Sequence, residues 1–270
     1  IKIFNGKHPK QFLHQLVSSQ LDMDRLDYLK RDSFFSGVTE GNIGTERIIN
    51  MLEIVNDNLV VEEKGIYSIE KFLIARRLMY WQVYLHKTVI SAENMLIKVL
   101  QRAKDLITAG KEVYAPASLS VFLNNYYTLN DFDTNPELLN YFAELDDFDI
   151  YASLKYWKSN PDFVLSSLSN MLLNRKLLKI TVQNTAFKTA EIKNELERIQ
   201  KQFNISKQEA EYFVFSDKVS NSTYNTEKAN INILMKNGDV IDITAASDHF
   251  NIEAVKKTVN KHFLCYPKLK

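Results

Sequence analysis

The stretch that decides the fold of this 270-residue chain is Gln20-Leu21-Asp22-Met23-Asp24-Arg25-Leu26-Asp27-Tyr28-Leu29-Lys30-Arg31-Asp32. It contains four aspartates and three basic residues but neither glycine nor proline, which favours a helix. Successive residues of an α-helix turn by about 100°, so Asp24, Tyr28 and Asp32 lie along one stripe. The leucines of the stretch can face a core, which leaves the polar stripe available for a ligand.

This stripe has a plain structural interpretation and a functional one. Opposite charges four positions apart pair with each other on many solvated helices. A carboxylate on the stripe can instead bind a hard metal ion, and Arg25 beside it can hold phosphate. Tyr28 can pack on a sugar or a base. The charge pattern alone leaves both interpretations open.

The order of residues in this stretch resembles a motif of a known family. Asp22-Met23-Asp24-Arg25-Leu26-Asp27-Tyr28, followed by Arg31-Asp32, is similar to the last metal-ligand helix of HD-domain phosphohydrolases. The similarity is to the dNTP triphosphohydrolase branch, which includes the sterile-alpha-motif and HD-domain enzyme and bacterial dGTPase-like proteins. It implies that Asp24 binds a divalent metal ion (manganese, magnesium, zinc or iron), that Arg25 contacts substrate phosphate, and that Tyr28 and Asp32 contact the deoxyribose.

A second motif follows in the same order as in that family. After Gly65, no glycine or proline occurs before Gly110, which predicts one long helix or two helices with a bend, with Ser68 as its N-cap. The family carries an arginine, a tyrosine eight residues later and then His-Lys, and Arg76, Tyr84 and His86-Lys87 reproduce this spacing. The resemblance implies that Arg76 holds the triphosphate and that Tyr84 walls the sugar pocket.

A basic cluster further along has a weaker functional interpretation. A helix is predicted from Pro161 to Lys179, which would place Arg175 and Lys179 one turn apart at its end. Cations are favoured there by the helix dipole alone. The resemblance implies instead that Arg175 and Lys179, together with Arg47 and Lys87, bind an activating nucleotide between the subunits of a homo-oligomer.

The upstream ligands of an HD metal site are not present in this sequence. The chain has five histidines and no His-Asp dipeptide, and a single aspartate cannot hold a metal ion. His8 and His14 are six positions apart, which does not match the ligand spacing of the family, and we expect them at the surface or in loops. Because the chain starts at Ile1, we expect a C-terminal part of a longer protein, with the catalytic histidine upstream.

Composition excludes several classes of protein. The chain is 45% hydrophobic and 25% charged, which is ordinary for a globular protein. A formal net charge of +1 gives no signature of duplex nucleic-acid binding. The apolar runs are too short to span a membrane, and no signal peptide is recognisable. The single cysteine, Cys265, fits a reducing, cytoplasmic environment.

The predicted fold is mainly α: a partial HD-domain helical bundle with small β-hairpins and a C-terminal α+β region. We expect residues 1–110 to belong to the catalytic core, 111–185 to a helical extension and 186–270 to the α+β region. The clearest local predictions are helices over 11–35, 45–51 and 189–202, and hairpins over 53–62 and 231–244, the latter around Asn237-Gly238.

The function predicted from these observations is metal-dependent hydrolysis of dNTP to deoxynucleoside and triphosphate. One alternative is another HD phosphohydrolase, either a nucleotidase or a phosphodiesterase. Tyr28, Asp32 and Tyr84 speak against it, because a sugar clamp is of little use without a nucleoside. The other alternative is a non-catalytic nucleotide-binding regulatory scaffold. A histidine followed by a His-Asp pair upstream of Ile1 would distinguish an enzyme from the scaffold.

Overall fold

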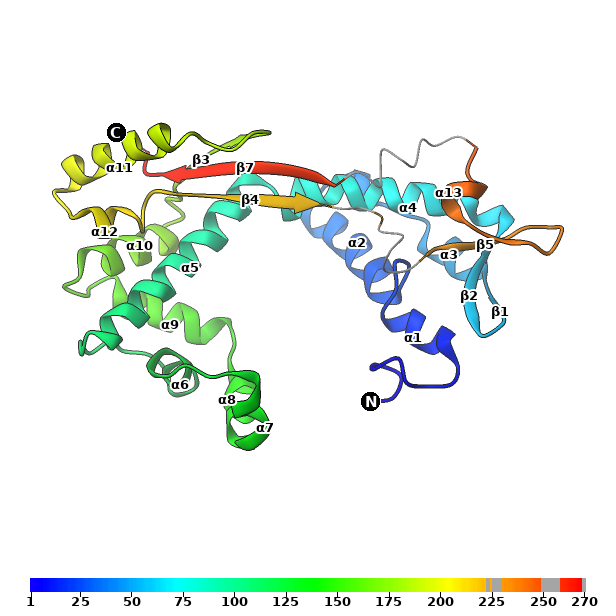
Figure 1. Ribbon diagram of the computed structural model, residues 1–270, viewed down its shortest axis with the longest axis horizontal. Coiled ribbons are helices and arrows are strands. Elements are labelled where there is room, and N and C mark those ends of the chain that lie inside the picture. The colour runs from blue at the N-terminus through cyan, green and yellow to red at the C-terminus, as the bar shows by residue number, and fades with distance from the viewer. Residues whose placement is uncertain (222–223, 225–229, 249–257, 269–270) are drawn as a thin grey trace. The chain divides into compact units, whose positions relative to one another are not determined.

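The computed structural model describes residues 1–221, 224, 230–248 and 258–268 (Figure 1). The fold of these residues is mainly α-helical with two small β-sheets, as the sequence predicts. Within the described residues, no helix is long and apolar enough to cross a membrane.

The chain packs into two compact units. Unit 1 comprises Ile1–His86 and Val219–Asn260, and unit 2 comprises Lys87–Lys218 and Lys261–Lys270. The chain therefore leaves unit 1 and later returns to it, whereas the sequence suggested three consecutive segments. Those three segments stay a prediction, because compact packing does not test which part of the chain takes part in catalysis.

Unit 1 combines helices with one four-stranded sheet around a shared apolar core. Leu26, Leu29 and Phe72 are fully buried in that core, and Leu21 is nearly so, as expected from the helical pattern. The elements of unit 1 are α1 (Gln11–Val17), α2 (Met23–Ser36), η1 (Thr39–Gly41), α3 (Thr45–Asn50), β1 (Leu52–Val55), β2 (Asn58–Glu62), η2 (Glu63–Gly65), α4 (Ile66–Met79), η3 (Tyr80–Tyr84), β5 (Asn232–Leu234), β6 (Val240–Asp242) and α13 (Ile243–Ala246).

The prediction of one continuous helix over residues 11–35 is wrong. The helix is interrupted at residues 18–22, between α1 and α2. Asp22 caps α2, because its carboxylate accepts a hydrogen bond from the backbone N–H of Arg25 at 2.8 Å. The same carboxylate accepts one from the N–H of Ser19 at 3.2 Å. One aspartate thus satisfies backbone donors on both sides of the break, which fixes where α2 begins.

Both predicted hairpins are present in the sheet of unit 1. β1 and β2 pair antiparallel, and the turn residues Asn56 and Asp57 have φ values of 49° and 60°. Two positive φ angles are what a two-residue type I′ turn requires. β5 and β6 pair antiparallel around Asn237-Gly238. Parallel pairing of β2 with β5 joins the hairpins into a sheet of order β1-β2-β5-β6.

The second long helix starts earlier than predicted and is interrupted once. α4 begins at Ile66 with Gly65 at the N-cap position, so Ser68 lies inside the helix and is not its cap. A Cβ atom on Gly65 would lie 2.5 Å from Cγ1 of Val61, which shows how closely the helix start approaches β2. The π-helical turn η3 then follows α4 directly. The bend allowed for in the sequence prediction is therefore a π-helical turn.

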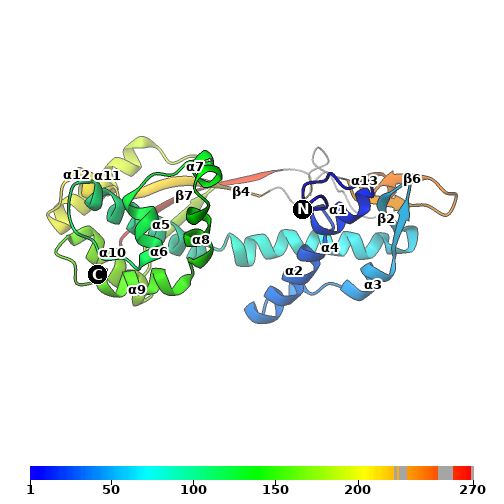
Figure 2. The same ribbon diagram turned by 90° about the horizontal axis from the view of Figure 1, so that it is seen from below.

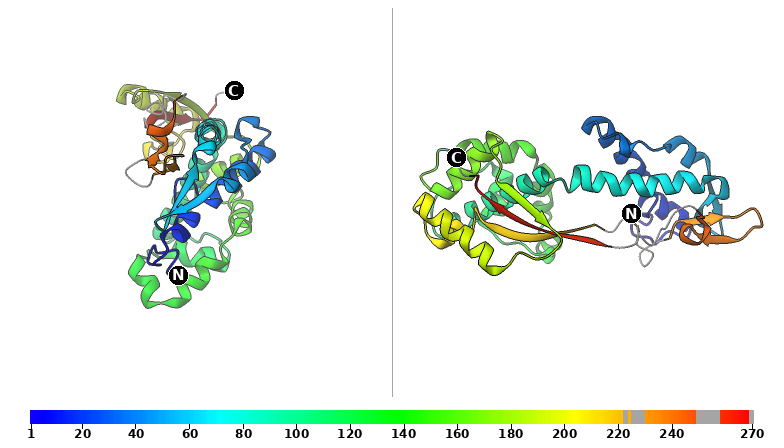
Figure 3. Two further views of the ribbon diagram at one scale, coloured as in Figure 1. Left: turned by 90° about the vertical axis from the view of Figure 1, so that its right-hand side faces the viewer. Right: turned by 90° about the horizontal axis from the view of Figure 1, so that it is seen from above.

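Unit 2 is built around one 22-residue helix, α5, against which α6 and α10 pack (Figure 2). Its three-stranded sheet has β7, red in Figure 3, between β3 and β4. The elements of unit 2 are α5 (Lys87–Thr108), α6 (Ala117–Asn124), α7 (Leu129–Thr134), α8 (Pro136–Glu144), α9 (Asp147–Trp157), α10 (Phe163–Leu173), β3 (Lys179–Gln183), α11 (Thr189–Phe203), α12 (Lys207–Ala210), β4 (Phe215–Asn221) and β7 (Val259–Tyr266). The end of β4 from Val219 and the start of β7 up to Asn260 are grouped with unit 1.

The predicted helix from Pro161 to Lys179 ends much earlier than expected. α10 stops at Leu173, Arg175 adopts a left-handed φ of 55°, and Lys179 is the first residue of β3. A left-handed residue ends a right-handed helix, so the chain turns out of α10 into the sheet. Arg175 and Lys179 are therefore not one helical turn apart, although both lie near the first turn of α5.

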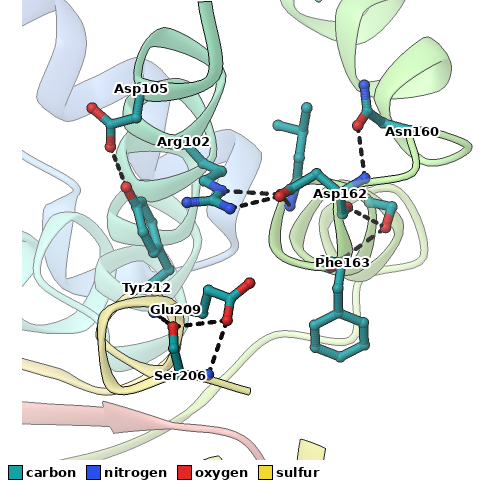
Figure 4. A network of polar contacts seen from close by, with 10 residues as sticks. Arg102, Asp105, Asn160, Asp162, Phe163, Ser206, Glu209 and Tyr212 are labelled. Carbon is teal, nitrogen blue, oxygen red and sulfur yellow. Dashed lines mark hydrogen bonds and ion pairs between the residues drawn. The ribbon is translucent and has the colours of Figure 1, made fainter. Parts of the chain in front are cut away.

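A polar network fastens α5 to α10 in unit 2 (Figure 4). The guanidinium of Arg102 donates two hydrogen bonds to the carboxylate of Asp162, at 3.0 and 2.6 Å. Asp162 also caps α10 by accepting from the N–H of Leu165. Burial alone would raise the pKa of Asp162, but these donors outweigh it and the pKa lies below its usual value. Asp105 accepts a further hydrogen bond from Tyr212, which brings the segment just after α12 into the network.

Candidate functional site

A cavity of about 590 Å³ opens in unit 1 between α2 and η3. Its wall contains five residues that the sequence assigned to a metal ion or a substrate, and they come from segments that are distant in the chain. The structure therefore brings together most of the predicted site. The residues lining the cavity are Ser18, Asp22, Asp24, Arg25, Tyr28, Asp32, Tyr80 and Tyr84.

The charged stripe of α2 supplies one side of the cavity. Asp24, Tyr28 and Asp32 lie one turn apart, as the helical spacing predicts. Asp24 is exposed, whereas Tyr28 and Asp32 are half-buried. The carboxylate of Asp24 thus lies on the open part of the wall, and the tyrosine and the second carboxylate lie deeper.

Arg25 is held in place by the break before α2. Its guanidinium donates to the carboxylate of Asp22 and to the backbone carbonyl of Ser19. About 28% of the Arg25 side chain remains exposed. Because a guanidinium has five N–H donors, Arg25 can keep these two contacts and still offer donors to an anion in the cavity.

Three tyrosines form an aromatic wall beside the carboxylates. The rings of Tyr28 and Tyr84 meet edge to face, with centroids 5.9 Å apart, and those of Tyr80 and Tyr84 do so at 5.2 Å. The hydroxyl of Tyr84 donates a 2.7 Å hydrogen bond to Oδ2 of Asp32. Both Tyr80 and Tyr84 belong to the π-helical turn, so the interruption of the helix places them side by side in the wall.

The two predicted sugar-contacting tyrosines are held in the protonated state. Burial is the largest cause of the raised pKa of Tyr28, and the neighbouring Tyr80 adds to it. Burial also raises the pKa of Tyr84, with the hydrogen bond to Asp32 as the next cause. Both phenols are therefore neutral at physiological pH, and the negative charge of the cavity comes from its aspartates.

Arg76 lies beside the aromatic wall and does not line the cavity itself. Only 7% of the residue is exposed. Its Nη1 donates to Oε1 of Gln20 at 3.0 Å, and its guanidinium carbon is 5.8 Å from the centroid of the Tyr80 ring. The predicted phosphate-binding arginine is thus next to the predicted sugar pocket, behind Tyr80.

The cavity residues do not by themselves fit a divalent metal ion. Asp22 is engaged by Arg25, and Asp32 accepts from Tyr84, which leaves Asp24 as the exposed carboxylate. Hard cations take about six or more oxygen ligands, of which one carboxylate supplies one or two. In the described part of the chain, no group of three or more His, Cys, Asp or Glu side chains is placed to hold a metal ion.

The histidines near the N-terminus have structural contacts away from this cavity. His14 shares a 2.8 Å hydrogen bond between Nδ1 and the carbonyl oxygen of Ile3. His8 accepts a hydrogen bond at Nδ1 from the backbone N–H of Lys10. His8 lies in a loop as expected, whereas His14 lies in α1 and is half-buried, which corrects the expectation for that residue.

A second cavity, of about 310 Å³, contains three of the four residues assigned to an activating nucleotide. Lys87, Arg175 and Lys179 line it, and Lys268 adds a fourth cation. It lies in unit 2 at the first turn of α5. Four cations around one cavity are suited to a phosphate-bearing ligand.

Arg47, the fourth residue of that prediction, belongs to unit 1. It is exposed near the end of α3, and its Nη2 donates to the backbone carbonyl of Lys64 at 3.3 Å. The structure of unit 1 therefore places Arg47 beside η2, and its assignment to the nucleotide site stays a prediction.

Sequence reasoning missed several residues of these cavities. Tyr80 lies four positions after Arg76 and four before Tyr84, so helical spacing could have assigned it to the site. Lys268 reaches the second cavity just after the end of β7, and Gln20, in the break before α2, holds Arg76 beside the first cavity. Neither spacing nor composition marks these two residues.

Known proteins with a similar sequence or structure support a family for this chain. Residues 43–116 match a family described as HD associated region. The crystal structure of a phosphohydrolase from Bacteroides thetaiotaomicron is 49% identical and superposes with a TM-score of 0.94, over 99% of this chain and 66% of that chain. These matches support an HD-domain family.

More distant matches agree with the HD-domain family. The uncharacterized protein YwfO of Bacillus subtilis is 30% identical over 94% of this chain and 57% of its own length. A Dictyostelium discoideum protein named deoxynucleoside triphosphate triphosphohydrolase SAMHD1 homolog is 26% identical over 42% of this chain and 23% of its own. The chain thus spans little more than half of YwfO and about two thirds of the Bacteroides phosphohydrolase.

Proposed function

We propose that this chain is part of a metal-dependent dNTP triphosphohydrolase, which releases triphosphate and a deoxynucleoside. The observation that carries the proposal is the 590 Å³ cavity, where a carboxylate, an arginine and three tyrosines face one another. Support for a phosphohydrolase comes from the HD-domain matches, and the name of the Dictyostelium relative supports the choice of dNTP.

The deep part of the cavity suits a deoxyribose. Tyr28 and Tyr84 offer ring surface, and Asp32 offers a carboxylate held by Tyr84. A sugar hydroxyl can donate to that carboxylate, while the apolar sugar face packs on a ring. Because the hydroxyl of Tyr84 also contacts Asp32, the two side chains fix each other's orientation before the sugar binds.

The cationic part of the site suits a triphosphate. Arg25 is anchored at the cavity wall by Asp22, and Arg76 lies behind Tyr80 with Gln20 as its partner. Arginines bind phosphate oxygens through two or more N–H groups, and their charge offsets the charge that develops during phosphoryl transfer. Asp24 would supply one ligand to a divalent metal ion, with the other ligands from outside this sequence. Such an ion polarises phosphate and activates water when bound.

The decisive test is the identity of the product. Full-length protein is incubated with each dNTP and a divalent metal ion, and the products are separated by ion chromatography. Release of triphosphate with deoxynucleoside supports the proposal. Release of monophosphate or pyrophosphate would identify the alternative, another HD phosphohydrolase, and binding without turnover would identify a regulatory scaffold.

Asp24→Ala separates a catalytic role of the cavity from a structural one. We expect it to abolish triphosphate release and to leave the thermal unfolding temperature unchanged, because Asp24 is exposed. Asp27→Ala is the matched control, since Asp27 is an exposed carboxylate on the same helix that pairs with Arg31 outside this cavity. Equal activity of the two variants would remove Asp24 from the active site.

We propose in addition that an activating nucleotide binds the second cavity in a homo-oligomer. The four cations of Lys87, Arg175, Lys179 and Lys268 support this candidate. Arg175→Ala should abolish activation by added nucleotide while basal turnover persists. Unchanged activation in Arg175→Ala would assign the regulatory ligand to another place.

A further inference from the structure

The turn between α1 and α2 holds Gln20 in a buried position. The N–H of Ser19 donates to the carboxylate of Asp22 at 3.2 Å, and the N–H of Leu21 donates to Oγ of Ser19 at 3.1 Å, so both ends of the turn are fixed. Leu21 packs into the core of unit 1, and Gln20 beside it is 7% exposed. Contacts within the turn itself therefore place the side chain of Gln20 inside the unit.

The side chain of Gln20 contacts Arg76, the buried arginine behind the aromatic wall. Oε1 of Gln20 accepts a hydrogen bond from Nη1 of Arg76 at 3.0 Å, across 56 positions of the sequence. A carboxamide carries no charge, so this contact orients the guanidinium without offsetting its positive charge. The contact of Arg25 differs in this respect, because Arg25 pairs with the carboxylate of Asp22. Gln20 thus orients Arg76 and adds no negative charge beside it.

The positive charge of Arg76 acts in the cavity although the residue does not line it. Its guanidinium carbon lies 5.8 Å from the ring centroid of Tyr80, which is a cavity residue. The pKa of the Tyr28 hydroxyl reflects the same charge: burial is the largest cause and raises this pKa, Tyr80 raises it further, and Arg76 lowers it. Charges in a partly buried site are screened much less than charges at the surface. An anion in the cavity would therefore be stabilised by Arg76.

We propose that Gln20 is a positioning residue, which orients Arg76 for the phosphates of the substrate and leaves its charge undiminished. A glutamate at this position would accept the same hydrogen bond, but its charge would offset that of Arg76 and repel the phosphates. An apolar side chain of similar length would remove only the orienting contact. The inference rests on the proposed function, which assigns Arg76 to phosphate, and it adds that the neutrality of Gln20 sets the affinity for triphosphate.

The first test compares two variants of the full-length protein by calorimetric titration with inorganic triphosphate and with a deoxynucleoside. Gln20→Glu should weaken the binding of inorganic triphosphate about tenfold or more, because the new carboxylate offsets the charge of Arg76. Gln20→Met removes the acceptor without adding charge and should weaken this binding about threefold. Both variants should change the affinity for the deoxynucleoside by less than about twofold, because a nucleoside carries no charge.

Stability distinguishes this role from a purely structural one. Gln20→Glu keeps the hydrogen bond to Arg76 and adds an opposite charge, so urea denaturation should find it more stable than Gln20→Met. A structural role would make the affinity follow the stability, whereas we expect the more stable variant to bind triphosphate more weakly. Gln15→Glu is the matched control, because Oε1 of Gln15 accepts from the backbone N–H of Leu59 at 2.7 Å and Gln15 does not line the cavity. This control should bind triphosphate within about twofold of the wild type.

A double variant tests whether Gln20 acts through Arg76. Gln20→Met should cause no further loss of triphosphate affinity in an Arg76→Ala background, because the side chain that Gln20 positions is gone. A Gln20→Glu affinity within about twofold of the wild type, a larger loss in Gln20→Met than in Gln20→Glu, or a Gln20→Met loss that persists in the Arg76→Ala background would each overturn the proposal. Ion chromatography of dNTP products tests the hydrolytic activity separately: a wild type that releases no triphosphate would overturn that activity, while the order of affinities decides the role of Gln20. Circular dichroism confirms that every variant is folded.

Discussion

The hydroxyl of Tyr84 donates a 2.7 Å hydrogen bond to Asp32, which lies 52 positions earlier in the chain. This contact joins the π-helical turn to α2 across the candidate active site. It orients the carboxylate that we assign to the sugar, and it fixes the ring that forms the adjacent wall. One hydrogen bond therefore sets the shape of the deepest part of the cavity.

Tyr84→Phe should weaken both the fold and the substrate site. Loss of a neutral hydrogen bond costs about 1 kcal/mol of unfolding free energy, measured by urea denaturation. We expect KM for dNTP to rise several-fold, because Asp32 loses the group that orients it. Tyr126→Phe is the control, since Tyr126 is 81% exposed in unit 2 and should change neither quantity. An unchanged KM in Tyr84→Phe would contradict the role of this pair in binding sugar.

Arg76→Ala should act on the phosphates more than on the nucleoside. If Arg76 stabilises the triphosphate, the variant should bind a non-hydrolysable dNTP analogue at least tenfold more weakly, while the affinity for the deoxynucleoside changes by less than twofold. Calorimetric titration measures both affinities. Arg77→Ala, the next residue on α4, is the positional control. Equal losses for both ligands would mean that Arg76 supports the fold of the site and does not bind phosphate.

Asp162→Ala should be among the more destabilising changes in unit 2. It removes the N-cap of α10 and leaves Arg102 without its partner in a largely buried setting. Breaking such a pair typically costs about 3 kcal/mol or more. Asp146→Ala removes an N-cap as well, but from the exposed start of α9, and should cost about 1 kcal/mol. Urea denaturation of both variants gives the comparison, and similar costs would show that the ion pair adds nothing to the cap.

The single cysteine makes one contribution to the pH dependence of stability at alkaline pH. Burial raises the pKa of Cys265 to about 12. A free thiol has a pKa of about 8.5, so the unfolded chain loses this proton first as pH rises. The thiol therefore adds a stability term that is fully present below about pH 8.5 and is lost progressively as pH rises toward 12. Cys265→Ala should flatten this part of the pH profile, and iodoacetamide at pH 8 should label Cys265 only in denaturant.

Much of the site was predictable because it depends on helical spacing. Asp24, Tyr28 and Asp32 are one turn apart on α2, and both hairpins were marked by their turn residues. The break before α2 was missed although its contacts are local, because the carboxylate of Asp22 accepts from the N–H groups of Ser19 and Arg25, each three positions away. Asp is a favoured N-cap residue, so the start of α2 was marked in the sequence, but the absence of glycine and proline was taken as continuity of the helix.

The position of the basic cluster shows a second limit of local patterns. The residues from Arg175 to Lys179 all have good helix propensity. The chain nevertheless forms strand β3 at Lys179, because β3 pairs with β7, which lies about eighty residues later in the chain. Pairing between distant segments overrides local preference. Arg175 and Lys179 still reach one cavity, although by a route that helical spacing did not describe.

The last prediction concerns residues 1–270 on their own. We expect this chain to bind no divalent metal ion specifically and to release no triphosphate from any dNTP, because Asp24 supplies one ligand where a hard cation needs about six. The helices should nevertheless form, since the core of unit 1 lies within the described residues. The assay adds manganese, magnesium, zinc or iron(II) to residues 1–270 and to the full-length protein in parallel, with circular dichroism as the check on folding. Turnover by residues 1–270 would place the missing ligands inside this sequence, whereas turnover by the full-length protein alone would place them outside it.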